Sequence, residues 1–299
     1  MSNLKKVPYL AKSVELHEDY ILDNQLHAKV PINETTNKIL QLVDGRKSVS
    51  EITEEANKEF KINYDVLYKD VNNLLDELNK NYLLNWKYIS NKKMQKILIN
   101  FISQYKKGYK ERTIINNSSF FSAFNSINNL VIKKIGIFFV WTLILYILSK
   151  IIYITSENSS TVRLALNFSL GVTIAFIGLI LSTSLHEISH VYSFWIQKRD
   201  KTIGFMGVSP FGVRFVRPVE KDPKINIIVS LSGPLIPGIL GILMYLISAT
   251  LLKEWQYNSQ ANIFAAMFIL QLIHCLPFTG DGKNVVKQIM IMRYRNKII

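Results

Sequence analysis

Residues 181–195 read LSTSLHEISHVYSFW and place three ionisable side chains, His186, Glu187 and His190, inside an apolar stretch. On a helix, residues four apart share a face, so both imidazoles point the same way with Glu187 at the margin. An ionisable group within a membrane span costs roughly 2.5–3.5 kcal/mol on insertion scales, so three together predict a bound cation. The alternative is that the three side chains only pair with one another inside a helical bundle.

The spacing of the two histidines suits Zn²⁺, which needs a third protein ligand and keeps an open fourth position for a water with a pKa near 7. Glu187 would accept the proton of that water and return it to the leaving amine, as peptide hydrolysis requires. The predicted third ligand is Asp281 in HCLPFTGDGKN at 274–284, where flanking glycines let the backbone turn the carboxylate. The alternative for Asp281 is an ordinary Asp-Gly turn at the end of a span.

From residue 135 the chain is hydrophobic, and four membrane spans are predicted, at 135–154, 165–196, 225–250 and 261–276. The predicted fold class is therefore mainly α, a polytopic helical membrane protein. Lysines and arginines flank the spans on one side, so the N-terminal domain and the C-terminus are expected in the cytosol of a multi-pass cell-membrane protein. Because these cations border apolar runs, no nucleic acid partner is expected.

Residues 135–299 resemble the site-2 protease family, intramembrane zinc metalloproteases that pair HExxH on one span with an Asp-Gly motif on a later span. The resemblance implies a zinc endopeptidase in which His186, His190 and Asp281 bind Zn²⁺ and Glu187 is the general base. His274 stands where the family has Asn, and only three residues separate Pro277 from Asp281. We expect His274 to orient substrate or simply to be buried, and Cys275 to act as a small hydrophobe.

Two further stretches resemble other parts of that family. SGPLIPG at 232–238 looks like its Gly-Pro stretch, and IGFMGVSPFGVRFVRP at 203–218 looks like a hairpin that holds substrate as an extended strand. The alternatives are an ordinary kinked membrane helix and a plain cytosolic loop. The candidate substrate-binding residues in these stretches are Gly233, Pro234, Phe211, Val213 and Phe215.

Residues 8–88 predict a separate α+β domain of the winged-helix type, with short strands followed by three helices. Asn33 is the expected cap of the first helix, Ser48 and Glu51 form a capping box for the second, and the third starts near Asn63. Leucines and valines from Leu67 to Leu78 then recur on one helical face.

The runs INETTNKILQLVDGRKSVSEITEEANKEF and VLYKDVNNLLDELNKNYLL in this domain resemble PqqD-like domains, over about the first third of the chain. The resemblance implies recognition of the leader region of a ribosomally made precursor peptide by strand addition to a sheet edge. The strand at 27–32 is a candidate edge, although Pro31 removes one donor. A winged-helix domain with another role is the alternative.

Residues 89–134 predict a basic amphipathic linker. Between 91 and 134 the chain has 9 Lys/Arg against 1 Asp/Glu. Ile97, Leu98, Phe101 and Ile102 are spaced for one face of a helix, which is typical of a helix at the lipid headgroups.

Together these features predict a three-part chain, with a PqqD-like domain at 8–88, the linker at 89–134 and an intramembrane zinc metalloprotease at 135–299. Its expected partners are a precursor or leader peptide, membrane lipid and a peptide-modifying enzyme or exporter. Two alternatives stay open: regulated intramembrane proteolysis of a membrane-bound signalling protein, and a catalytically inactive scaffold or export partner for a peptide.

Overall fold

The computed structural model describes residues 5–90, 92–105, 108–116, 118–155, 159–210 and 212–298. The chain forms two compact units: unit 1 comprises Met1–Ile115 with Thr202–Pro218, and unit 2 comprises Asn116–Lys201 with Val219–Ile299. Unit 1 therefore takes in a segment that the predicted division had assigned to the 135–299 domain.

Unit 1 is built from short β-strands and amphipathic α-helices. They are β1 (Lys5–Leu10), β2 (Val14–Leu16), β3 (Tyr20–Asp23), β4 (Ala28–Pro31), α1 (Glu34–Gln41), α2 (Val49–Phe60), α3 (Tyr64–Lys80), β5 (Leu84–Ile89), α4 (Lys93–Ser103), β6 (Glu111–Thr113), β7 (Phe205–Ser209) and β8 (Gly212–Val216).

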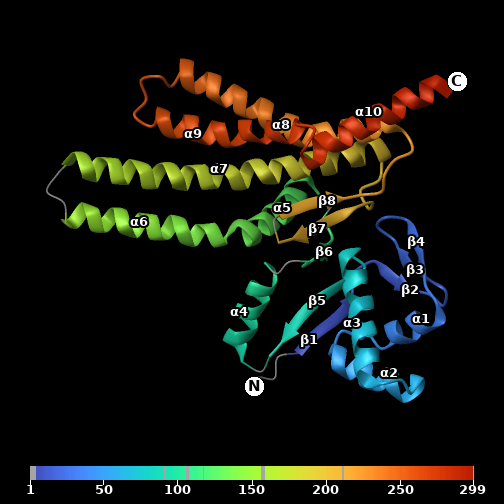
Figure 1. Cartoon of the computed structure of the whole chain (residues 1–299). Helices are drawn as coiled ribbons and strands as arrows, with labels where there is room; N and C mark the ends of the chain where they lie inside the picture. The colour runs from blue at the N-terminus through green and yellow to red at the C-terminus, as the bar shows by residue number, and fades with distance from the viewer. Residues whose placement is uncertain are drawn as a thin grey trace. The chain divides into compact units, whose positions relative to one another are not determined.

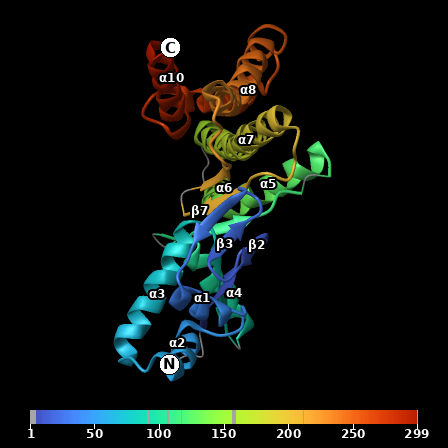
Figure 2. The same cartoon turned by 90° about the vertical axis from the view of Figure 1, so that its right-hand side faces the viewer.

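The first two sheets and three helices of unit 1 follow from local sequence rules. Strands β2, β3 and β4 form an antiparallel sheet in that order, with β4 at one edge, and β1 pairs with β5. The predicted caps are present: Asn33 accepts from the amide of Thr36, Ser48 and Glu51 form the capping box, and Asn63 caps α3. The apolar faces of α1 to α3 pack with β2, β3 and β5 around one core, which includes the fully buried Ile21, Leu40, Ile52, Val71 and Leu75. Figure 2 shows α1 next to the strands β2 and β3.

The third sheet explains why residues 202–218 belong to unit 1. β6 pairs with β7, and β7 pairs with β8, all antiparallel. Arg112 of β6 forms a buried, two-pronged ion pair with Asp23, at 2.7 and 2.8 Å, and its guanidinium lies 4.0 Å from the ring centre of Phe205 on β7. Phe205 is fully buried and meets Tyr82 edge-on. The hairpin β7–β8 thus packs into the core of the N-terminal unit.

Unit 2 is helical in its described residues. Its elements are α5 (Phe120–Ile135), α6 (Ile137–Thr155), α7 (Ser159–Lys198), α8 (Pro223–Thr250), α9 (Asn258–Ile269), the 3₁₀ helix η1 (Leu270–Cys275) and α10 (Gly280–Ile298). In Figure 1, α6 runs beside α7, and α8 beside α9.

Among the described residues, three helical segments are long and apolar enough to cross a membrane: 160–198, 223–250 and 258–295. A fourth crossing is counted only if α5 and α6, bent by 64° at their junction, act as one span. The structure thus has helices that are long and apolar enough to span a membrane, as predicted. Helix length and composition give three crossings, or four if α5 and α6 count as one span.

Candidate metal centre

His186, His190 and Asp281 bring their metal-binding atoms together within unit 2. The histidines lie one turn apart on α7, and Asp281 lies in the first turn of α10. His186 Nε2 lies 3.1 Å from Asp281 Oδ2 and 3.1 Å from His190 Nε2, and His190 Nε2 lies 3.4 Å from Asp281 Oδ1. Among the described residues, these three form the group that could hold a metal ion, with all ligand atoms within 4.8 Å of one another.

The spacing of these atoms fits tetrahedral zinc. Bonds of about 2.0–2.2 Å at tetrahedral angles separate neighbouring ligand atoms by about 3.3–3.5 Å, close to the distances in the cluster. Two imidazoles and one carboxylate also form the protein share of several catalytic zinc sites, which leave one position open. Both histidines are buried, so their rings are largely removed from bulk solvent.

A backbone contact from α8 fixes the orientation of His190. Its Nδ1 donates to the carbonyl oxygen of Val229 at 2.6 Å, which leaves the lone pair of Nε2 free to face Asp281. Gly233, one turn further along α8, supplies the space for the ring, because a Cβ atom there would lie 2.2 Å from Nε2. Val229 and Gly233 together therefore set where the second histidine points.

Polar contacts between helices hold the ligand-bearing segments in register. Gln271 of η1 donates to Ser182 of α7 at 3.0 Å, and Asn284 of α10 donates to Ser230 of α8 at 2.6 Å. Ser232 of α8 donates to the carbonyl of Ser189 on α7 at 3.1 Å. Polar groups in an apolar helical bundle are costly unless paired, so these pairs favour one arrangement of the four segments.

Glu187 and His274 lie next to the cluster. Glu187 is buried on α7 beside its histidine neighbour. The ring of His274 lies 4.9 Å from that of His186, edge-on, and the residue is exposed, so the expectation that His274 is simply buried is wrong. A continuous helix over 274–281 would have put His274 about 10 Å along the axis from Asp281. The chain instead leaves η1 after Cys275, turns, and re-enters a helix at Gly280, which brings His274 near.

The other predicted substrate-contacting residues are distributed over both units. Pro234 is buried within α8, next to Gly233. Val213 and Phe215 lie on β8 in unit 1, while the cluster lies in unit 2, and Phe211 lies outside the described residues. Their contact with a substrate stays a prediction.

The sequence did not predict the contacts made around the cluster by Val229, Ser182 and Gln271. Val229 acts through its backbone carbonyl, which no side-chain pattern reveals. Ser182 and Gln271 carry a weak signal, because each is a polar residue inside an apolar run.

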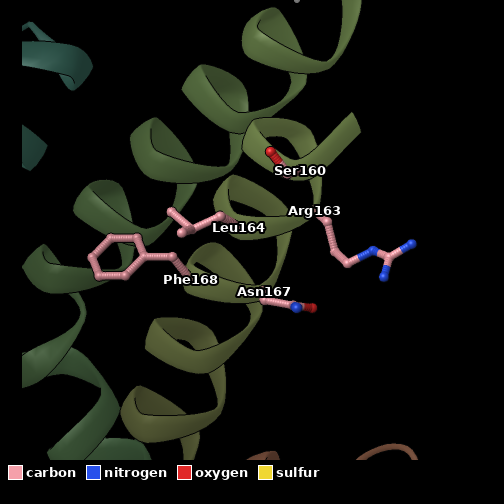
Figure 3. Close-up of a pocket in the computed structure, with 5 residues that line it drawn as sticks. All are labelled: Ser160, Arg163, Leu164, Asn167 and Phe168. Carbon is pink, nitrogen blue, oxygen red and sulfur yellow. The ribbon is translucent and has the colours of Figure 1, made fainter. Parts of the chain in front are cut away.

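A hollow at the other end of α7 does not belong to this cluster. It is lined by Ser160, Arg163, Leu164, Asn167 and Phe168, and Figure 3 shows Leu164 and Phe168 on one side of the helix with Arg163 and Asn167 on the other. Phe168 and His186 are 18 residues apart in α7, or about 27 Å along a helix axis. The hollow contains none of the residues with metal-binding chemistry.

Comparison with known families identifies one part of the chain. Residues 22–84 match the family model described as "Coenzyme PQQ synthesis protein D (PqqD)", so unit 1 contains a PqqD-like domain. Domains of this kind bind peptides and partner enzymes in peptide-modification systems. No curated protein and no solved structure matches the chain. The match ends before α4, so unit 2 is interpreted from its own residues.

Proposed function

We propose that the chain is a membrane-embedded zinc metalloendopeptidase, similar to the site-2 proteases, that hydrolyses a peptide bond in a ribosomally made precursor peptide. The observation that carries the proposal is the convergence of His186 Nε2 and His190 Nε2 with a carboxylate oxygen of Asp281, which lies 95 residues after His186, with Glu187 adjacent. Such a set inside apolar helices is costly to bury without a cation.

The roles of the residues follow from their positions. His186, His190 and Asp281 would hold Zn²⁺, which when bound polarises the scissile carbonyl and lowers the pKa of a water. Glu187 accepts one proton from the attacking water as its oxygen bonds to the carbonyl carbon. When the carbon–nitrogen bond breaks, Glu187 gives that proton to the departing amine, so the products are a carboxyl group and an amine.

The PqqD-like domain supports the choice of substrate class. Strand β4 is an edge of the sheet β2–β3–β4, and an extended leader peptide can add to such an edge through backbone hydrogen bonds. Pro31 lies at the end of β4, so its missing N–H removes only the last donor. A peptide held on a covalently attached domain reaches the protease at a raised effective concentration. A peptide-modifying enzyme or an exporter would act on the same peptide.

The pairing of β6 with β7 supports four crossings. Strand β6 precedes α5 in the chain, and strand β7 follows α7. Because strands cannot pair across a bilayer, an even number of crossings must separate β6 from β7. α7 supplies one crossing, so the bent pair of α5 and α6 would supply another. Lys198, Arg199 and Lys201 at the end of α7 then favour a cytosolic location for unit 1.

Co-expression with short peptides encoded beside the gene tests the activity. Mass spectrometry should find a cleaved peptide with the native chain and only intact peptide with Glu187→Gln, since loss of a general base costs about 10²–10⁴-fold. Identical products with both chains would mean that the site is not catalytic. Cleavage of a membrane-spanning protein instead would indicate regulated intramembrane proteolysis.

Zinc content tests the metal site separately from cleavage. Purified native protein and Glu187→Gln should both hold one zinc per chain, whereas His190→Ala should not. Metal-free native protein, purified without chelator, would overturn the proposed zinc site and favour a non-catalytic scaffold.

A further inference from the structure

We propose that α4 lies on the surface of a bilayer that contains anionic lipid, with its apolar face among the acyl chains. Five large apolar residues follow one another at the spacing i, i+3, i+4, i+7, i+8, and all are between 39% and 78% exposed: Met94, Ile97, Leu98, Phe101 and Ile102. By contrast, the comparable stripe of α3 is buried in the core of unit 1. Within the described residues of unit 1, the apolar face of α4 thus stays largely exposed.

The opposite face of α4 is fixed to unit 1, so the apolar face cannot turn inward. The side chain of Asn100 pairs with the backbone of Tyr88 on β5, accepting from its N–H at 3.2 Å and donating to its carbonyl at 3.4 Å. Ser103, on the same side, is buried and donates to the carbonyl of Asn100 at 3.0 Å. These contacts hold the helix with its apolar residues pointing outward.

The charges of α4 and its flanks match an anionic surface. Residues 91–110 contain six lysines and no acidic residue. Lys92, Lys93 and Lys96 lie at the start of the helix and are exposed. Lysine stems can extend along an apolar surface while their ammonium groups reach phosphates, and each lysine near an anionic leaflet strengthens binding about fivefold. An apolar stripe flanked by lysines alone is typical of a helix in the headgroup region.

The chain keeps α4 within reach of a membrane. Sixteen residues separate Ser103 from the start of α5 at Phe120, a segment of at most about 50–60 Å when extended. Unit 1 is also connected by chain to the ends of α7 and α8, both able to cross a bilayer. With 11 residues, α4 is about 16 Å long, which is too short to cross the hydrocarbon core of about 30 Å. The helix therefore lies along the surface.

Site-directed labelling of the full chain tests this placement. Cys275 is replaced by alanine, and a single cysteine at Leu98→Cys, or independently at Ile102→Cys, carries a small fluorophore. The exposed Lys58→Cys on α2 is the matched control. The protein is reconstituted in vesicles of phosphatidylcholine with a minority of phosphatidylglycerol, with and without bromine on the acyl chains.

We expect brominated lipid to quench the label at Leu98 and aqueous iodide to leave it bright, with the reverse at Lys58. Quenching of the Leu98 label by iodide would mean that the face is in water, and protection from both quenchers would mean that protein covers it. Either result overturns the proposal.

A separate experiment tests whether the lysines of α4 contribute to membrane binding. Changing Lys92, Lys93 and Lys96 to glutamine, or omitting phosphatidylglycerol, should shift the Leu98 label toward iodide quenching. Unchanged quenching by brominated lipid under both conditions would refute the requirement for anionic lipid.

Discussion

The substitution Gly233→Ala should damage the proposed metal centre although it replaces none of the three proposed ligands. A Cβ atom at this position would lie 2.2 Å from His190 Nε2 and 2.3 Å from Cε1, whereas ordinary contact needs about 3.4 Å. The ring would have to move by about 1.2 Å, the difference between 3.4 and 2.2 Å. Metal–ligand distances tolerate only about 0.2 Å, so His190 would no longer bind with the other two ligands.

We expect zinc affinity to fall by about 10–100-fold or more, the range found when the groups that orient a ligand are lost. The assay is competition with a zinc-binding dye on purified protein, followed by elemental analysis. Gly280→Ala is the matched control, because its added methyl group would meet no atom within 4 Å although it lies beside Asp281. Native zinc affinity in Gly233→Ala would refute the arrangement in which Gly233 supports the ring of His190.

Three further predictions concern unit 1 and the metal. Arg112→Gln leaves the carboxylate of Asp23 buried without its charged partner and should lower the free energy of opening, measured by hydrogen exchange of β3, by about 3–5 kcal/mol. The control Lys38→Gln, which breaks two exposed ion pairs with Glu34 and Glu59, should leave this free energy unchanged, and equal effects of the two substitutions would contradict the expected role of the buried pair. Phe205→Ala should destabilise the same unit by about 3–5 kcal/mol in the same measurement, and no effect would mean that the hairpin is not part of its core. A strong zinc chelator should abolish peptide cleavage and added zinc should restore it, whereas activity that survives chelation would exclude a zinc-dependent reaction.

Local chemistry made much of unit 1 predictable. The caps at Asn33, Ser48 and Asn63 act over three residues, so the helix starts could be read directly from the sequence. The cluster of His186, His190 and Asp281 was also predicted as a set, since a metal site with two histidines one turn apart needs a third ligand and Asp281 has the required chemistry and flexible flanks. The structure brings these atoms together, and their occupancy by zinc remains our proposal.

Long-range pairing and backbone contacts could not be predicted in this way. β6 has only three residues, with no strand pattern, and pairs with residues some 95 positions later, so nothing local indicates that residues 202–218 join unit 1. The proximity of His274 to His186 depends on where the chain leaves η1, and a helical extrapolation would have missed it. The carbonyl of Val229 carries no sequence signature at all.

Because residues 202–218 belong to unit 1, this unit cannot be completed until they have been synthesised. During synthesis, residue 115 leaves the peptidyl-transferase centre 103 residues before residue 218, which at about 5–20 residues per second is a delay of roughly 5–20 s. Until then Phe205 is absent, Arg112 lacks its aromatic neighbour and β6 has no partner. The N-terminal unit can therefore reach its final form only after α7 has been made, which couples completion of the unit that contains the PqqD-like domain to synthesis of the helix that carries His186 and His190.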